Sequence, residues 1–145
     1  MNGHSLERFQ PWSDLVFRVL FSWIFIVGGL GHWRQHEYMM GRLLDSPWYD
    51  WVVAIGDPSL LMYASGAVLG IAGLALLVGL ATRIAALALF VTLVPITFVI
   101  HVAPDHVGPF LKNVAILGGL VHFFVRGSGA FGLDRRSGST IKEHS

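Results

Sequence analysis

The sequence predicts an all-α integral membrane protein built on a bundle of four transmembrane helices. Four long apolar stretches together hold more than half of the 145 residues, and 54% of the chain is hydrophobic while only 13% is charged. The mean hydropathy is +0.62, whereas soluble proteins average roughly 25% charged residues. The chain leaves room for one membrane domain and for no separate soluble module.

The four stretches are Leu15–Trp33, Pro58–Leu80, Ile84–His101 and Leu111–Val125. A helix needs about 20 apolar residues, and at least about 17, to cross a hydrocarbon core of roughly 30 Å. The first three stretches have this length, and the fourth reaches it if its helix begins near Val107. The sequence therefore predicts four crossings.

Basic residues predict the orientation of the bundle. An even number of crossings places both termini on one side, and that side holds seven basic residues: Arg8, Arg18, Arg83, Arg126, Arg135, Arg136 and Lys142. The other side holds three, which are Arg34, Arg42 and Lys112. Because basic residues concentrate in cytoplasmic loops, we expect both termini to be cytoplasmic, that is N-in and C-in.

Three segments follow from this organisation. Residues 1–13 are expected to form a cytoplasmic N-terminal segment, because the first apolar stretch is too long for an ordinary cleaved signal. Residues 14–134 form the membrane domain. Residues 135–145 are rich in Ser, Gly and charge, which predicts a disordered cytoplasmic tail.

The segment between the first two spans predicts a short interfacial helix in the first outer loop. His32–Leu44 is expected to continue as a helix, and Ser46 followed by Pro47 is a typical start for a second, short helix. Asp57 followed by Pro58 starts the second span in the same way. Because Trp and Tyr favour the membrane interface, this aromatic segment is expected to anchor there, with a lid over a ligand pocket as the alternative.

The composition also excludes several kinds of chemistry. The chain has no cysteine, so thiol catalysis, disulfide exchange, thiolate-held iron–sulfur clusters and cysteine-ligated zinc are excluded. The net charge of +1 argues against a nucleic-acid partner. Small residues in the second span (Gly66, Gly70, Gly73) and the fourth (Ala115, Gly118, Gly119) predict close helix packing.

Ionisable residues at membrane depth are functional candidates, because burying one at mid-bilayer costs about 2.5–3.5 kcal/mol on insertion scales. Near the cytoplasmic side, Asp14 and Arg18 are spaced for an i, i+4 ion pair. His122 shares a helix face with Ala115 and Gly118 and is therefore expected to point into the bundle. Arg18 and His122 are candidates for a ligand or proton site; in the favoured alternative Arg18 reaches lipid headgroups and His122 bonds a backbone carbonyl.

A second set of polar residues lies near the outer side. A quinone headgroup requires hydrogen-bond donors at the edge of the apolar layer, and His101, Lys112 and Asn113 are the predicted contacts. The spacing of His32 and His36, with His106 or His101, also suits a metal site or axial haem ligation. A structural role for these histidines in the interface is the remaining alternative.

Several motifs in this chain resemble the DoxX family of small four-helix membrane proteins. Leu76–Arg83 matches an "LLxGLxTR" segment, and residues 127–134, with Gly127, Gly129, Gly132, Leu133 and Asp134, match a "GxGxxSLD" ending. Arg18, His101 and the run Lys112-Asn113-x-Ala115-x-x-Gly118-Gly119 also fit. The resemblance covers roughly Asp14–Asp134. It implies a bacterial or archaeal cytoplasmic-membrane protein, related to membrane subunits of quinone-linked oxidoreductases or to partners in redox-stress assemblies.

The sequence therefore predicts the membrane subunit of a quinone-linked redox system, which contributes a headgroup site or anchors a soluble redox partner. No nucleophile, nucleotide loop or cofactor motif is visible, so catalysis by this chain alone is not expected. The alternatives are a structural accessory subunit, a small-molecule or proton transporter, and a His-ligated metal or haem binder. The expected partners are the lipid bilayer, a redox protein and further copies of the chain.

Overall fold

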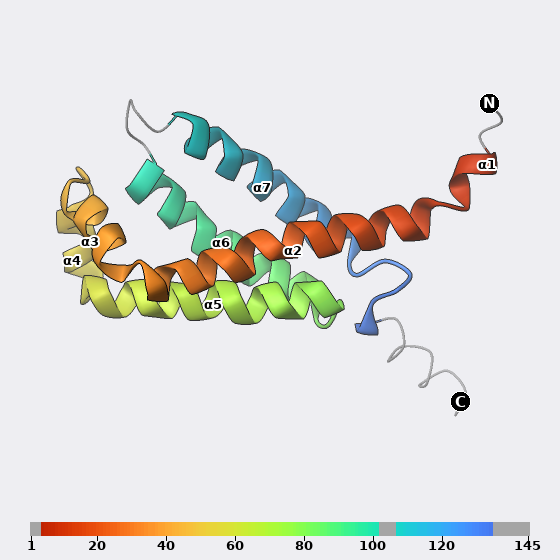
Figure 1. Ribbon diagram of the computed structural model, residues 1–145, viewed down its shortest axis with the longest axis horizontal. Coiled ribbons are helices and arrows are strands. Elements are labelled where there is room, and N and C mark those ends of the chain that lie inside the picture. Colours follow the sequence, from red (N-terminus) through yellow and green to blue (C-terminus); the bar gives the residue numbers. More distant parts are fainter. Residues whose placement is uncertain (1–3, 102–106, 135–145) are drawn as a thin grey trace.

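The structure, a computed structural model, describes residues 4–101 and 107–134, and these residues form helices and turns with no strand among them (Figure 1). Four helices are long and apolar enough to cross a membrane, namely α2 (Gln10–Arg34), α5 (Pro58–Val78), α6 (Thr82–His101) and α7 (Val107–Arg126). Three short helices, α1 (His4–Glu7), α3 (His36–Leu44) and α4 (Tyr49–Ile55), complete the described chain. The four predicted spans are confirmed, and the fourth begins at Val107, so the chain is a multi-pass membrane protein.

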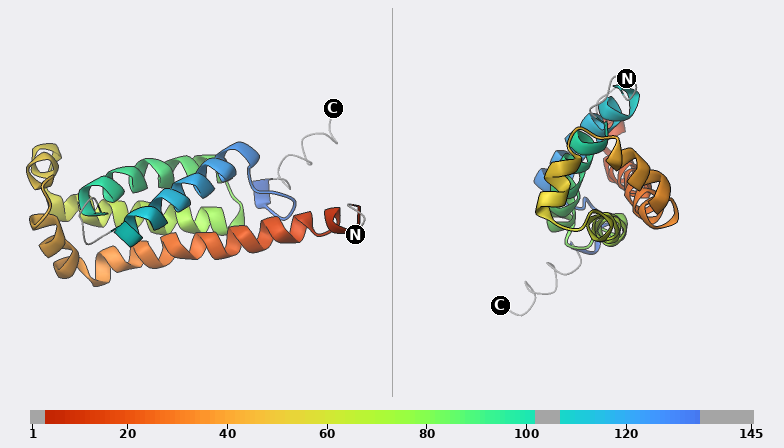
Figure 2. Two further views of the ribbon diagram at one scale, coloured as in Figure 1. Left: turned by 90° about the horizontal axis from the view of Figure 1, so that it is seen from above. Right: turned by 90° about the vertical axis from the view of Figure 1, so that its left-hand side faces the viewer.

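The spans pack in an order that leaves α2 and α7 as the two outer members. α2 packs along α5, α5 along α6, and α6 along α7. We call the end at which α2 begins and α7 ends the base. Near the base α7 contacts α2 through aromatic rings, because the ring of Phe123 lies 5.0 Å from that of Phe17 and 5.4 Å from that of Phe21. At the opposite end α3 and α4 lie across the bundle (Figure 2).

Glycines allow α2 and α5 to touch backbone to backbone. A Cβ atom on Gly29 would lie 2.6 Å from the carbonyl oxygen of Gly66 and 2.7 Å from the backbone nitrogen of Gly70. Farther along, a Cβ atom on Gly73 would lie 3.0 Å from Cβ of Phe25. The predicted packing role of the small residues in the second span is confirmed.

The interior of the bundle is an apolar cluster centred on α5, α6 and α7. Leu76, Leu89 and Leu120 are fully buried in it. Many apolar side chains lie outside instead, such as Ile71 and Ile84, which are 71% and 72% exposed. In a membrane these side chains face lipid, so their exposure carries no hydrophobic cost.

Three helix boundaries differ from the sequence-based expectation. α2 begins at Gln10 rather than after Asp14, so the first span includes an additional turn with Pro11 near its start. The expected continuous helix over residues 32–44 breaks at Gln35, whose φ of −115° and ψ of 30° are not helical. α4 begins at Tyr49 rather than at Pro47.

Ser46 connects the loop before α4 to α6. Its hydroxyl accepts from the N–H of Trp48 at 3.2 Å, as a capping side chain does, and donates to the carbonyl oxygen of Val99 at 2.5 Å. Asp57 behaves as predicted, because its side chain accepts from the N–H of Leu60 at 2.8 Å and caps α5. The expected disordered tail, 135–145, lies outside the described residues.

α4 fits the predicted interfacial helix in composition. None of its residues is buried, and Trp51 and Ile55 are 67% and 77% exposed. Exposed Trp and aliphatic side chains on one short helix are typical of a segment at the membrane surface. Whether it also acts as a lid stays a prediction.

Candidate functional site

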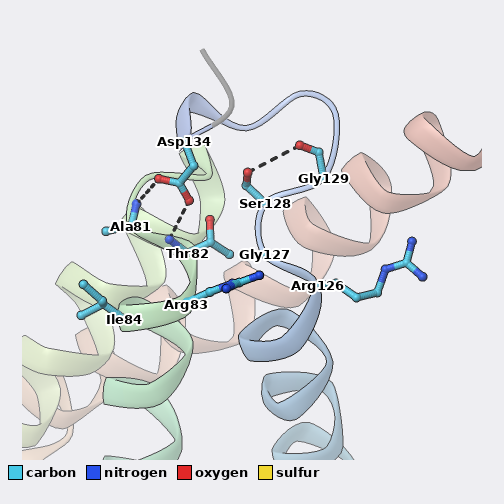
Figure 3. A pocket seen from close by; sticks show the side chains of 9 residues that line it. All are labelled: Ala81, Thr82, Arg83, Ile84, Arg126, Gly127, Ser128, Gly129 and Asp134. Carbon is cyan, nitrogen blue, oxygen red and sulfur yellow. Dashed lines mark hydrogen bonds between the residues drawn. The ribbon is translucent and has the colours of Figure 1, made fainter. Parts of the chain in front are cut away.

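Three segments that are distant in the sequence meet at the base. The carboxylate of Asp134 accepts hydrogen bonds from the N–H of Ala81 at 2.6 Å and from the N–H of Thr82 at 2.9 Å (Figure 3). The N–H of Asp134 donates to the carbonyl oxygen of Gly79 at 2.9 Å. Asp134 therefore caps the first turn of α6, although it follows α7 in the chain.

Arg18 holds the segment after α7 against α2. Its side chain is only 2% exposed, and its guanidinium donates to the carbonyl oxygens of Ser128 and Phe131, the latter at 3.2 Å. The ring of Phe131 also packs on Trp12, with ring centroids 5.0 Å apart. A buried cation is tolerated when carbonyl oxygens and an opposite charge surround it.

These contacts correct two expectations for Arg18. Asp14 does not pair with it, because within the described residues the carboxylate of Asp14 faces Arg126, at an N–O distance of 3.9 Å. Arg18 also does not extend to lipid headgroups, since its guanidinium is enclosed by residues 128–131. Spacing along one helix indicated a local partner, but the distant chain segment offered more acceptors.

Gly79 is required at this junction for two reasons. Its φ is +69°, in the left-handed region that favours glycine. A Cβ atom on it would lie 2.5 Å from Nη1 of Arg18 and 2.6 Å from Cα of Gly132. The glycine in the α5–α6 turn thus lets Arg18 and the final segment approach the turn.

The environment of Asp134 lowers its pKa. Partial burial alone would raise the pKa, but the N–H of Thr82, the side chain of Thr82, the N–H of Ala81 and the positive charge of Arg18 together outweigh that effect. The hydroxyl of Thr82 is buried and makes no hydrogen bond of standard geometry within the described residues. The two backbone N–H groups are therefore the defined partners that favour the ionised form.

His122 faces outward, so its expected inward direction was wrong. α7 buries the face that carries Asn113, Ile116, Leu120 and Phe123. The opposite set, Ala115, Gly118 and His122, is exposed. Ala115 and Gly118 were taken to indicate the packed face of α7, whereas larger side chains fill that interface. Gly119 does pack closely, because a Cβ atom on it would lie 2.5 Å from the ring of Phe21 on α2.

Aromatic rings surround His122 on one side. Its ring lies 5.7 Å from that of Phe17 and 5.6 Å from that of Phe123, measured between centroids, and Phe17 stacks on Phe123 at 5.0 Å. These three residues, with Asp14 and Arg126, line a small pocket of about 70 Å³. We call it the His122 pocket.

The three predicted outer quinone contacts lie in different surroundings, and their convergence on one headgroup stays a prediction. Asn113 is 4% exposed, and its amide nitrogen donates to the hydroxyl of Thr97 at 3.0 Å, between α6 and α7. Lys112 is exposed on another face of α7, and His101 is half-buried at the end of α6. The amide nitrogen of Asn113 is therefore committed to helix packing.

The outer histidines bond to serines of α5. Nδ1 of His32 lies 2.9 Å from the hydroxyl of Ser65, and Nε2 of His36 lies 2.7 Å from the hydroxyl of Ser59. The ring of His36 also stacks on Tyr63. These contacts join α2 and α3 to α5.

The metal or haem site that the histidine spacing suggested stays a prediction. In the part of the chain that the structure describes, no group of three His, Cys, Asp or Glu side chains is close enough to hold a metal. His106, the third expected ligand, lies outside the described residues. His32 and His36 each bond to a serine of α5.

A larger, open groove lies on the base between the start of α6 and the segment after α7. Its volume is about 600 Å³, and Arg83, Arg126, Gly127 and Asp134 are among the residues that line it (Figure 3). The guanidinium of Arg83 donates to the carbonyl oxygen of Val125 at 3.2 Å. In Figure 3 the side chain of Arg126 extends away from Arg83. We call it the Arg83 groove.

Sequence reasoning identified the motifs at the base but missed their contact. Gly79, Thr82 and Asp134 were recognised as parts of two motifs, yet none was named as a site residue. A signal was present, because both motifs combine glycines with a residue suited to helix capping. Their spacing in the chain gives no information on whether they meet.

Comparison with known proteins identifies a family for most of the chain, and the matched part contains Leu76–Arg83 but not residues 127–134. The family model described as DoxX matches residues 13–102, which include nearly all of α2 and the whole of α5 and α6. The same comparisons found no matching curated protein and no matching solved structure. Since the match covers more than half of the chain, and the four spans agree with it, the chain belongs to the DoxX family.

Proposed function

We propose that the protein is the membrane subunit of a quinone-linked redox system and that His122 contributes the contact to the quinone headgroup. Membership of the DoxX family supports the redox context. The observation that carries the site is an imidazole exposed on the outer surface of a membrane-spanning helix, close to the end of that helix.

A packing role alone does not account for His122. A histidine that serves the protein interior is normally buried and hydrogen-bonded. His122 is exposed, and within residues 4–101 and 107–134 its recorded contacts are with the rings of Phe17 and Phe123. Its nitrogens are therefore available to a ligand that arrives through the lipid.

The neighbours of His122 suit the headgroup of a quinone. The exposed ring of Phe17 offers an apolar face on which a flat ring can stack, and such aromatic pairs contribute about 0.5–1.5 kcal/mol. The imidazole can donate to one quinone carbonyl. The His122 pocket, at about 70 Å³, receives only the edge of the ring, so the rest of the headgroup would lie against the helix surface in lipid.

The surroundings of His122 also offer an apolar surface for the isoprenoid tail of the quinone and polar groups for proton exchange. Val121 and Val114 on α7 are exposed and apolar, which suits an isoprenoid chain lying along the helix. On the other side of His122, Asp14 and Arg126 form an ion pair at the base. Proton exchange between a bound quinone and water would therefore pass through polar groups of this chain.

The rest of the redox system lies in other proteins. The chain has no cysteine and no nucleotide-binding motif, so we propose that a redox partner, soluble or in the membrane, supplies the electrons. We place the protein in the cytoplasmic membrane of a bacterium or archaeon, with the base on the cytoplasmic side. An accessory subunit or a transporter remains the alternative if no quinone binds.

The test is quinone binding in lipid nanodiscs that contain a short-chain ubiquinone analogue. After washing, the retained quinone is measured from the near-ultraviolet bleach on reduction. We expect the wild-type protein to retain quinone and His122→Leu to bind it at least about tenfold more weakly, the loss expected for one good hydrogen bond.

Lys112→Gln is the matched control at the opposite end of α7, and we expect it to bind quinone as the wild type does. If Lys112→Gln loses the quinone while His122→Leu keeps it, the headgroup site is at the outer end and the assignment to His122 is wrong. If the wild-type protein retains no quinone, the proposed function itself fails.

A further inference from the structure

Arg83 lies across the Arg83 groove and is held in place by the end of α7. A Cβ atom on Gly127 would lie 3.8 Å from Nε of Arg83, and Nη2 of Arg83 donates to the carbonyl oxygen of Val125. Val125 provides a neutral acceptor, which leaves the charge of the guanidinium uncompensated by this contact.

The other charged groups of the groove already have partners. Asp134 accepts from two backbone N–H groups and faces the positive charge of Arg18. Arg126 is paired with Asp14. Among the described residues, Arg83 has no carboxylate within ion-pair distance, so the groove carries a net positive charge at Arg83.

The groove opens beside the lipid-facing surface of α6. Ile84, Leu87 and Val91 follow Arg83 along one face of the helix and are 72%, 48% and 61% exposed. An apolar stripe thus begins directly next to the cation. A small soluble anion would gain nothing from such a stripe, whereas a molecule with a charged head and a hydrocarbon chain would contact both parts.

We infer that the Arg83 groove binds the phosphate of an anionic phospholipid, with one acyl chain lying along Ile84, Leu87 and Val91. Guanidinium groups suit phosphate oxygens because they donate two parallel hydrogen bonds. Basic residues near a membrane surface also gain about 1 kcal/mol each from anionic lipid. The groove adjoins the His122 pocket, with which it shares residues 126–129, but His122 does not line it, and the inference does not depend on quinone binding.

The test compares retention of two phospholipids in mild detergent by native mass spectrometry. We expect the wild-type protein to retain phosphatidylglycerol at least fivefold better than phosphatidylcholine, and Arg83→Gln to lose that preference. Arg34→Gln changes an exposed arginine at the opposite end of α2 and is expected to behave as the wild type does. Equal retention of the two lipids by the wild type, or unchanged preference in Arg83→Gln, would overturn the inference.

A second measurement avoids the risk that Arg83→Gln disturbs the contact with Val125. Wild-type protein is photo-crosslinked to phosphatidylglycerol with a reactive group on its acyl chain, and we expect adducts on residues 84–91. Adducts confined to other helices would contradict the proposed path. Addition of inorganic phosphate distinguishes the source of the ligand: displacement of the lipid by millimolar phosphate would mean that the site takes a soluble phosphate, and the lipid assignment would be wrong.

Discussion

Asp134 combines two interactions that are usually made by different residues. It caps the N-terminus of α6 through the N–H groups of Ala81 and Thr82, and its charge faces the buried guanidinium of Arg18. Loss of a capping side chain costs about 1 kcal/mol. Loss of the charge adds a further cost, because Arg18 then lies buried opposite a neutral group.

We predict that Asp134→Asn lowers the free energy of unfolding by about 1–3 kcal/mol at pH 7, since one carboxylate acceptor and the charge are lost. Asp57→Asn is the control. Asp57 caps α5 through Leu60, and asparagine caps helices about as well as aspartate. Thermal unfolding of both variants in detergent gives the comparison, and equal midpoints would contradict a role for the charge.

The pH dependence of the same variant follows from the lowered pKa of Asp134. The folded state holds the proton less tightly than the unfolded state, so this contribution to stability is present above the unfolded pKa of about 3.9 and is lost as pH falls through the folded value. The difference between the wild type and Asp134→Asn should therefore shrink below about pH 4.

For single residues, the sequence predicted which polar residues lie near the base better than it predicted where their side chains point. Arg18 was named as a candidate site residue, but its expected partners were wrong because the carbonyl groups that it binds lie 110 and 113 residues away in the chain. His122 was placed on the wrong face because small residues were taken as the packed side of α7. The spacing of Ile116, Leu120 and Phe123 also indicated a face, and it was the buried one.

Among the helices, the contact between α2 and α5 depends on the absence of side chains. We predict that Gly29→Ala destabilises the bundle by about 1–3 kcal/mol, because the added methyl group would clash with the backbone of Gly66 and Gly70. Gly28→Ala is its matched control, since a Cβ atom there meets nothing within 4 Å. It should leave stability unchanged or raise it slightly, as alanine favours helix more than glycine does.

Thermal unfolding of the two variants checks this, and similar losses for both would mean that helix propensity or folding yield, rather than the clash, determines the result.

The spans themselves were predictable because length and apolar composition are local properties. The bond between Ser46 and Val99 was not predictable, because the two residues are far apart in the chain. Gln35 carries no strong breaking signal, so the break between α2 and α3 also escaped prediction.

In the whole molecule, the two ends of the bundle differ in construction. The base joins α2, the α5–α6 turn and the segment after α7 through one arginine and one aspartate. The opposite end uses histidine–serine contacts between α2, α3 and α5 and the bond from Ser46 to Val99 of α6. Helix periodicity contains no information about such distant contacts, which explains why the sequence predicted the four spans but not how the base is closed.

The orientation of the bundle stays a prediction, and the absence of cysteine makes it easy to measure. We predict that, in intact cells, a membrane-impermeant maleimide labels Gly41→Cys on α3 but labels Ser13→Cys at the base only after permeabilisation. Both positions are exposed, and Gly41 has open space around its Cβ position. The reverse pattern would place both termini outside the cell.

The capping of α6 by Asp134 has a consequence for synthesis of the chain. A ribosome delivers the first turn of α6 52 residues before the side chain that completes it. Until then the N–H groups of Ala81 and Thr82 and the guanidinium of Arg18 must rely on water or lipid headgroups. The contacts at the base are therefore completed only after α7, the last spanning helix, has been made. A nascent chain that ends before residue 134 lacks the carboxylate that caps α6 and faces Arg18.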